Sequence, residues 1–222
     1  MRRSDLDLVI FDCDGVLVDS ERIAIRIDVD VIGRHGWEIT EAEVIELFVG
    51  RSDSFMRDEV ARRTGRELGA DWDAAFVGDY RAALERELIA VDGIAVALDA
   101  IDALGLETCV ASSGSHEKMR FTLGLTDLWD RFAGRIFSAA EVERGKPAPD
   151  LFLHAATQMA SSPDRCAVVE DSAAGVEAAL AAGMSVIAYA GGVTPRSRLD
   201  RPGVTIIDDM RELPAALTAI ER

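Results

Sequence analysis

Residues 6–21 read LDLVIFDCDGVLVDSE, and this stretch holds the two features that decide the fold. Residues 6–11 are a short apolar run with β-branched side chains, which is typical of a buried strand. Two aspartates and Gly15 follow at once, and these residue types favour a loop. Ligands of open α/β sheets bind at the carboxyl ends of the strands. The residues that follow each apolar run are therefore the first place to look for function.

Further apolar runs of strand length recur along the chain, with helical patterns between several of them. The runs cover residues 107–111, 135–137, 166–169, 185–189 and 204–207, and the helical patterns cover 94–104, 116–123, 150–159 and 173–182. Alternating strands and helices favour a parallel sheet that is covered on both faces, with right-handed crossovers. We therefore expect an α/β fold.

One long segment interrupts this alternation. Residues 20–90 contain no convincing strand, but they offer amphipathic helical segments at 20–33, 41–48, 52–63 and 71–90. We therefore expect a helical module inserted after the first strand. The predicted division is an α/β core made of residues 1–18 and 92–222, and an all-helical domain made of residues 19–91.

Composition restricts the partners. The 222 residues include 24 Lys+Arg and 40 Asp+Glu, which gives a formal net charge of -16. Such a charge repels nucleic acid and anionic membrane surfaces, so we expect neither as a partner. A phosphorylated small molecule would have to be attracted locally, by a metal ion and a few basic side chains. The acidic surface also makes a monomer the default expectation.

The cysteines and the start of the chain indicate the compartment. Cys13, Cys109 and Cys166 lie far apart without CxxC spacing, so we interpret them as buried small side chains in a reducing environment. The apolar run at residues 6–11 is too short for a signal peptide or a membrane span. We expect a cytoplasmic protein.

The first candidate site residues are Asp12 and Asp14. Side chains two apart in an extended segment share a face, so these carboxylates point together while Cys13 points into the core. Two carboxylates held that close repel each other and favour a cation between them or a shared proton. An exposed Asp-Gly turn is the alternative interpretation.

The next candidates follow the second apolar run. The hydroxyl of Ser112 and the backbone N–H groups of Ser113 and Gly114 precede a predicted helix and can bind an anion. An ordinary loop with a helix cap is the alternative. Lys146 lies in GKPAPD, where two prolines stiffen the chain, so it is better placed to hold a phosphoryl oxygen than a lysine in an ordinary solvated loop.

The last pair is Glu170 and Asp171, which follow the apolar run at residues 166–169. Carboxylates at the end of a strand suit the hard oxygen ligation that magnesium prefers. Simple capping of the next helix by Asp171 is the alternative.

Taken together, these four segments resemble a known family. Their order, DCDG, then Ser112, then Lys146 in GKPAPD, then Glu170-Asp171, is similar to the four motifs of the haloacid dehalogenase superfamily. The chain looks most like its β-phosphoglucomutase-like phosphatases, which carry a helical cap after the first motif. The resemblance covers essentially the whole chain and implies a Rossmann-like parallel sheet core with an inserted all-helical cap domain.

The resemblance implies a role for each motif. Asp12 would attack the phosphorus and form an aspartyl phosphate, and Asp14 would protonate the leaving group and later activate water. Mg²⁺ would be bound by Asp12, the Asp14 carbonyl and Asp171, with Glu170 assisting directly or through water. Ser112, with the Ser113 backbone, and Lys146 would hold the phosphoryl oxygens.

Two further residues are candidates for substrate contact. Arg51 stands in a cap segment that resembles the one facing the active site in this subfamily, where it would grip a distal phosphate or carboxylate. His116 follows the Ser112 loop and could touch the leaving group. For both, an ordinary solvated position at the start of a helix is the alternative.

Other functions remain to be weighed against a phosphatase of small phosphorylated metabolites. A dehalogenase has no need of Asp14, and a phosphonatase relies on a cap lysine, which this chain lacks. A β-phosphoglucomutase-type mutase is the closer rival, although Ala24 stands where a mutase would carry a histidine. A non-catalytic binding protein of the same fold would be favoured by loss of a motif residue, and none is lost.

Overall fold

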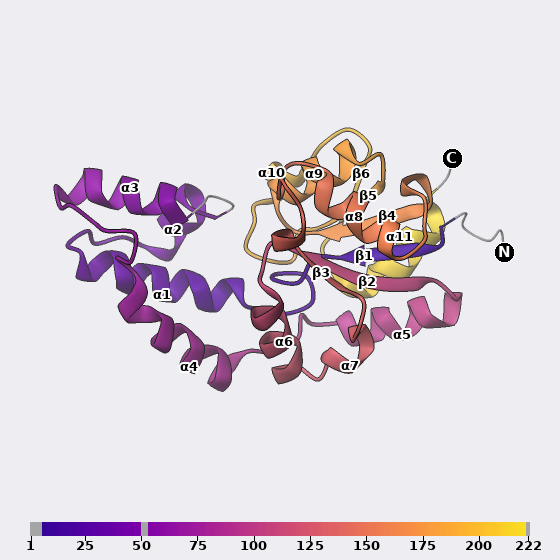
Figure 1. Ribbon diagram of the computed structural model, residues 1–222, viewed down its shortest axis with the longest axis horizontal. Helices are drawn as coiled ribbons and strands as arrows, with labels where there is room; N and C mark the ends of the chain where they lie inside the picture. The colour runs from indigo at the N-terminus through magenta and orange to yellow at the C-terminus, as the bar shows by residue number, and fades with distance from the viewer. Residues whose placement is uncertain (1–5, 50–52, 221–222) are drawn as a thin grey trace. The chain divides into compact units, whose positions relative to one another are not determined.

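The computed structural model describes residues 6–49 and 53–220 (Figure 1). The chain forms two compact units. One consists of residues 1–19 and 89–222, and the other of residues 20–88. The division predicted from the sequence, 19–91 for the helical part, lies close to these limits.

The larger unit is built on one parallel sheet of six strands, as expected. The strand order is β3-β2-β1-β4-β5-β6, and every neighbouring pair is parallel. The strands are β1 (Leu8–Phe11), β2 (Glu107–Ser112), β3 (Ile136–Ser138), β4 (Cys166–Glu170), β5 (Ser185–Tyr189) and β6 (Val204–Ile207). Phe11, the last residue of β1, pairs with Val110 of β2 and Val169 of β4. The residues that follow these three strands therefore meet at one edge of the sheet.

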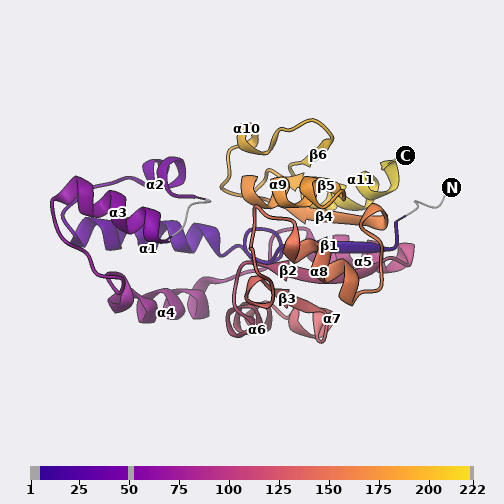
Figure 2. The same cartoon turned by 45° about the horizontal axis from the view of Figure 1, so that its top comes forward.

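Helices cover both faces of this sheet (Figure 2). They are α5 (Ile94–Leu104), α6 (His116–Leu125), α7 (Trp129–Phe132), α8 (Asp150–Gln158), α9 (Ala173–Ala181), α10 (Arg196–Leu199) and α11 (Leu213–Ala219), with short 3₁₀ turns at Ala139–Glu141, Pro163–Arg165 and Met210–Glu212. Leu8 and Ile10 pack into a core cluster with side chains of α8 and α9. Phe11 points to the opposite face, where its ring meets Phe132 of α7 at 6.1 Å. β1 is therefore buried from both sides, as its uninterrupted apolar sequence predicts.

The cysteines fulfil their expected structural role. Cys13, Cys109 and Cys166 are all buried and free of disulfides. The Sγ atom of Cys13 lies 3.9 Å from Oγ1 of Thr122 on α6, which ties the loop after β1 to that helix. Burial raises the pKa of the Cys13 thiol well above its ordinary value, so this residue acts as a packing group rather than a nucleophile.

The smaller unit is helical. Its elements are α1 (Glu21–Arg34), α2 (Glu41–Leu47), α3 (Asp53–Thr64), a 3₁₀ turn at Ala74–Phe76 and α4 (Val77–Glu87). The helix predicted over residues 71–90 is wrong in its first third, because a regular helix begins only at Val77. The backbone N–H groups of Ala74 and Phe76 instead bond to carbonyls three residues back, at Asp71 and Asp73. Aspartates favour such turns over helix interiors.

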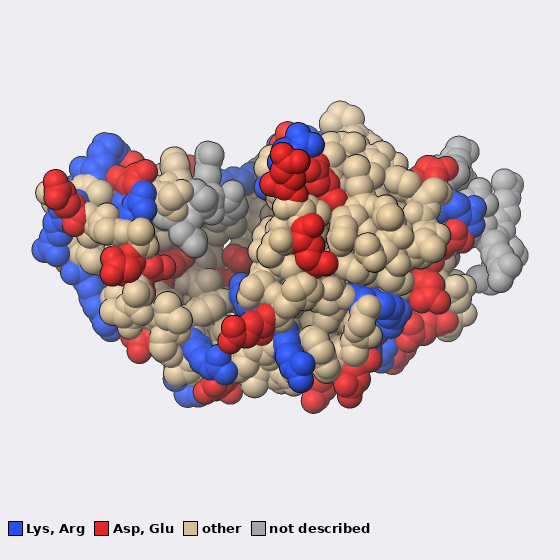
Figure 3. All heavy atoms as spheres, in the orientation of Figure 1, with Lys and Arg blue, Asp and Glu red and all other residues tan. Residues whose placement is uncertain are grey.

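The surface and the helices also bear on the expected partners. Acidic and basic side chains are interspersed on the face shown in Figure 3. Within the described residues, no helix combines the length and the apolar content that crossing a membrane requires. The expectations of no nucleic acid partner, of a monomer and of a cytoplasmic location stay predictions.

Candidate active site

The loop after β1 lies against an acidic residue that directly follows β4. The Gly15 N–H donates to the Val18 carbonyl at 2.8 Å, which closes a tight turn. Gly15 has φ +76, and a Cβ atom added there would fall 2.0 Å from Oδ2 of Asp171. Glycine is therefore required twice, by the backbone conformation and by the close approach of Asp171. The carboxylate of Asp171 thus lies against the loop that carries Asp12 and Asp14.

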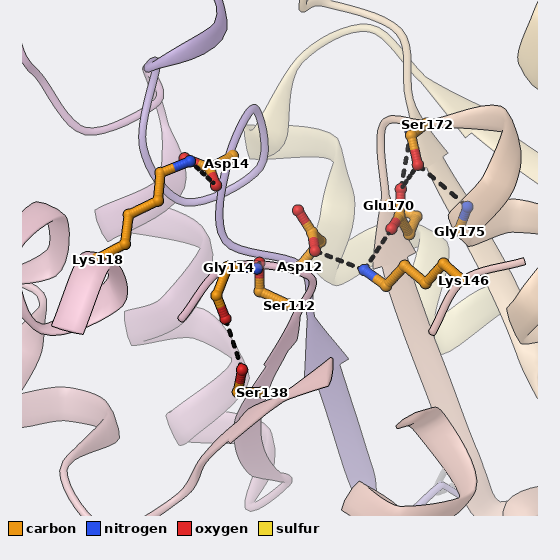
Figure 4. Close-up of polar contacts among 10 residues, drawn as sticks. All are labelled: Asp12, Asp14, Ser112, Gly114, Lys118, Ser138, Lys146, Glu170, Ser172 and Gly175. Carbon is orange, nitrogen blue, oxygen red and sulfur yellow. Dashed lines mark hydrogen bonds and ion pairs between the residues drawn. The ribbon is translucent and has the colours of Figure 1, made fainter. Parts of the chain in front are cut away.

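Lys146 joins two buried carboxylates at the carboxyl edge of the sheet (Figure 4). Its Nζ atom lies 2.5 Å from Oδ1 of Asp12 and 2.7 Å from Oε1 of Glu170. The Lys146 side chain is only 5% exposed, so the ammonium group is held between the two acids away from bulk water. In Figure 4 the second oxygen of Asp12 points away from this lysine.

Burial and neighbouring charges shift the pKa values of Asp12 and Lys146. Burial, together with the negative charges of Glu170 and Asp14, outweighs the effect of Lys146 and raises the pKa of Asp12 to about 7. Burial alone would lower the pKa of Lys146, but the charges of Asp12 and Glu170 prevail and raise it. Lys146 therefore stays an ammonium ion, ready to bind an anion.

Glu170 has both of its oxygens engaged with hydrogen-bond donors. Oε1 accepts from Lys146, and Oε2 accepts from the backbone N–H and the hydroxyl of Ser172, at 2.7 and 2.9 Å. Ser172 in turn caps α9 by accepting from the Gly175 N–H at 3.0 Å. Glu170 therefore fixes the position of Lys146, and its expected assistance to a metal ion stays a prediction.

The Ser112 loop lies beside Asp12 and is braced from β3. The buried Ser112 hydroxyl accepts from the Gly114 N–H at 3.2 Å, while Ser113 is exposed. The hydroxyl of Ser138 donates to the Gly114 carbonyl at 2.7 Å. Figure 4 shows Ser138 and Gly114 next to each other. The loop conformation is thus set before any anion binds.

His116 belongs to a neighbouring polar cluster. Its Nε2 atom lies 2.9 Å from Oε1 of Glu141, and Nε2 of His154 lies 3.3 Å from Oε2 of the same carboxylate. Glu141 also accepts from the Ser138 N–H at 2.6 Å, so this cluster supports the residue that braces the Ser112 loop. The predicted contact of His116 with the leaving group stays a prediction. Arg51 lies outside the described residues.

Sequence reasoning missed one residue of this site. Nζ of Lys118, on α6, lies 2.7 Å from Oδ2 of Asp14, and Figure 4 shows the two side chains facing each other. The sequence held one signal for it, since Lys118 follows Ser112 by less than two helical turns and α6 begins in between.

The residues present fit a hard divalent cation. Asp12, Asp14, Glu170 and Asp171 supply four carboxylates against the two ammonium groups of Lys118 and Lys146, which leaves an excess of negative charge in this set. In the part of the chain that is described, no three His, Cys, Asp or Glu side chains form a metal cluster by themselves. Mg²⁺ commonly needs only one or two carboxylates, with a carbonyl and water completing its shell. Asp12 and Asp171, with the Asp14 carbonyl, would hold it.

Comparison with known proteins identifies the family. A model described as haloacid dehalogenase-like hydrolase matches residues 6–183. The chain belongs to the haloacid dehalogenase-like hydrolase family. Its 6-phosphogluconate phosphatase relative from Escherichia coli is 34% identical over 216 residues, which cover 95% of this chain and 94% of that protein.

Solved haloacid dehalogenase-like structures agree with the fold. One from Agrobacterium tumefaciens has a TM-score of 0.87 and 37% identity, and the match covers 96% of this chain and 98% of that one. A family hydrolase from Deinococcus radiodurans, with bound phosphate and sodium, has a TM-score of 0.80 and 30% identity, with 97% and 96% covered. The family, the Rossmann-like α/β fold and the hydrolase class expected from the sequence are confirmed.

Proposed function

We propose that this haloacid dehalogenase-like hydrolase is a Mg²⁺-dependent phosphatase that cleaves a small phosphorylated metabolite through an aspartyl phosphate at Asp12. The observation that carries this proposal is the contact of Lys146 with both Asp12 and Glu170. A carboxylate nucleophile and a phosphate group repel each other, and a buried ammonium group beside the nucleophile reduces that repulsion.

In the first step, the Asp12 carboxylate attacks the phosphorus. A new bond forms between an Asp12 oxygen and phosphorus, while the bond from phosphorus to the leaving oxygen breaks. Oδ1 is bound to Lys146, so the second oxygen is the better placed nucleophile. The Ser112 hydroxyl and Lys146 hold the equatorial phosphoryl oxygens, where charge develops in the transition state.

Asp14 moves the protons. It donates one to the leaving oxygen, which departs as an alcohol, and it later takes one from the water that attacks the phosphorus of the aspartyl phosphate. That attack breaks the bond to Asp12 and releases phosphate, which restores both carboxyl groups. Lys118 contacts Asp14 and would orient its side chain.

A magnesium ion at Asp12, Asp171 and the Asp14 carbonyl would supply charge neutralisation and polarisation of the phosphoryl group. The close approach of Asp171 to Gly15 supports this ligand set, because it brings a second carboxylate to the loop of the nucleophile. Glu170, which contacts Lys146, would assist this ion directly or through water.

The comparison with relatives supports a substrate class. The 34% identical relative is named for 6-phosphogluconate, which is the phosphate ester of a sugar acid. We therefore infer a sugar phosphate or sugar-acid phosphate as substrate. A mutase is the less favoured alternative, because Ala24 of α1 carries no side-chain donor or acceptor.

A phosphate-release screen tests the proposal. The purified protein is stripped with EDTA and assayed with and without Mg²⁺ on sugar phosphates, sugar-acid phosphates, glycolate phosphate and nucleotides, beside an isomerisation assay with β-glucose 1-phosphate. We expect phosphate release only with Mg²⁺ and fastest on a sugar or sugar-acid phosphate. Isomerisation without release would favour the mutase, and no turnover of any ester with Mg²⁺ would refute the proposed function.

A further inference from the structure

The distribution of lysine in this chain is unusual. Of its 24 Lys+Arg residues only two are lysines, Lys118 and Lys146. Each of them contacts one aspartate of the first motif, Lys118 at Asp14 and Lys146 at Asp12. An ammonium group makes compact single contacts, whereas a guanidinium favours a two-pronged grip on a carboxylate. The exclusive use of lysine at these two places points to matched roles beside the two acids.

Lys118 has contacts at its backbone, on its stem and at its ammonium group. Its backbone N–H donates to the Ser115 hydroxyl at 3.2 Å, in the cap of α6, and its carbonyl accepts from the Thr122 hydroxyl at 3.1 Å. A Cβ atom added at Gly114 would fall 3.6 Å from the Cδ atom of Lys118, so the lysine stem runs past the Ser112 loop. The ammonium group then reaches Oδ2 of Asp14 at 2.7 Å.

The same helix also holds the residue before Asp14. Thr122 Oγ1 lies 3.9 Å from Sγ of Cys13, one turn further along α6 from Lys118. α6 therefore contacts the DCDG loop twice, once on its buried side and once at the Asp14 carboxylate. The Asp14 side chain is 15% exposed and that of Lys118 is 37% exposed, so the ion pair is partly accessible to solvent.

We propose that Lys118 is a positioning residue that holds the Asp14 carboxyl group where the leaving oxygen takes its proton. This inference rests on the proposed function, since it assigns Lys118 to the proton transfer of that reaction. A carboxyl group held through Oδ2 keeps its orientation between turnovers, so the geometry for proton transfer is present when substrate arrives. Lys118 itself forms no bond to phosphorus or to the leaving group.

Leaving groups of graded basicity separate this role from others. Loss of a positioned acid slows esters whose leaving oxygen needs a proton, and it spares those whose leaving group departs as a stable anion. The test compares kcat/KM for 2,4-dinitrophenyl, 4-nitrophenyl and phenyl phosphate, because kcat/KM reports the step that phosphorylates Asp12. Lys118→Met keeps the apolar stem against Gly114 and removes the charge.

We expect Lys118→Met to lose roughly 10- to 100-fold in kcat/KM on phenyl phosphate, part of the 10²- to 10⁴-fold that a full general acid contributes. On 2,4-dinitrophenyl phosphate it should stay within about twofold of the wild type. Plotting the logarithm of kcat/KM against the pKa of the leaving group gives a slope for each variant. Asp14→Asn sets the slope for complete loss of the acid. Arg120→Met removes a charge from the same helix, where Arg120 lies over the Trp129 ring at 5.2 Å, and should keep the wild-type slope.

The slope does not depend on the fraction of folded protein, so partial unfolding of the variant cannot imitate the expected result. An equal loss on all three esters, or a change in KM alone, would overturn the role of Lys118 while leaving the phosphatase intact. If the wild type with Mg²⁺ releases phosphate neither from these esters nor from any substrate of the phosphate-release screen, the proposed function itself fails.

Discussion

Gly175 lies so close to Glu170 that a Cβ atom at position 175 would fall 1.8 Å from Oε1 of the glutamate. That oxygen is the one that accepts from Lys146, and Lys146 in turn contacts Asp12. The backbone of α9 therefore sets the position of the nucleophile through two intervening side chains. A glycine is needed at position 175 because a side chain there would push the Glu170 carboxylate away from Lys146.

Gly175→Ala should therefore impair both stability and activity. The new methyl group cannot fit without moving Glu170, and such overpacking commonly costs about 1–3 kcal/mol. Because Lys146 moves with Glu170, phosphate release should fall at least about tenfold, which a steady-state assay measures beside urea denaturation. Gly124→Ala is the matched control, since its Cβ meets nothing within 4 Å in α6 and alanine favours a helix. Wild-type activity in Gly175→Ala would refute the coupling.

Lys146→Met should destabilise the protein by about 3–5 kcal/mol, because it leaves the carboxylates of Asp12 and Glu170 buried without their ammonium partner. Adding Glu170→Gln removes one of those charges and should restore part of the free energy of unfolding, while phosphate release stays absent. Denaturant titration of both single variants and the double variant measures the coupling. Arg144→Met serves as control, because it breaks the exposed pair with Asp150 and should cost less than about 1 kcal/mol.

If the free energies of unfolding of Lys146→Met and the wild type differed by less than about 0.5 kcal/mol, the ion pair of Lys146 with Asp12 and Glu170 could not be buried.

Glu141→Gln should destabilise the protein at neutral pH and have little effect in acid. Burial raises the pKa of Glu141, but the Ser138 N–H and the two histidines prevail and hold it below its ordinary value of 4.5. A lowered folded pKa contributes stability that is present above 4.5 and lost as pH falls through the lowered value. The difference in free energy of unfolding between Glu141→Gln and the wild type, about 1 kcal/mol at pH 7, should therefore shrink as pH falls below 4.5.

Urea denaturation between neutral and acidic pH measures this gap. Glu143→Gln, an exposed neighbour, should show no gap at any pH. A gap for Glu141→Gln that stays constant with pH would assign the effect to packing rather than to charge.

Much of the fold could be predicted from residue patterns. The strands of the core coincide with short apolar runs, since a strand buried on both faces is mostly apolar, as in β1 and in residues 166–169 of β4. The predicted helix at residues 71–90 failed at its start because amphipathic spacing continues through Asp71 and Asp73, which form turns in the structure. Local side-chain hydrogen bonding competes with the helix at such positions.

The sequence predicts which residues form the candidate site, but it does not predict the contacts among them. Asp12 and Asp171 directly follow β1 and β4, and Ser112 ends β2, so these residues could be proposed from the strand pattern, whereas Lys146 is proposed from its GKPAPD motif. The pairing of Lys118 with Asp14 joins residues 104 positions apart, and the short spacing from Ser112 to Lys118 does not by itself indicate which side chain the lysine contacts. The engagement of Glu170 by Ser172 and Lys146 likewise depends on how closely α9 approaches β4.

The central claim is that Asp12 is the nucleophile, and Asp12→Asn tests it most directly. The amide oxygen of the variant can still accept from Lys146, so its melting temperature should stay near that of the wild type, whereas the amide cannot form the aspartyl phosphate. The decisive measurement is the rate of phosphate release by folded Asp12→Asn with Mg²⁺ and the best substrate. The account predicts no release above background, and turnover within about tenfold of the wild type would contradict it.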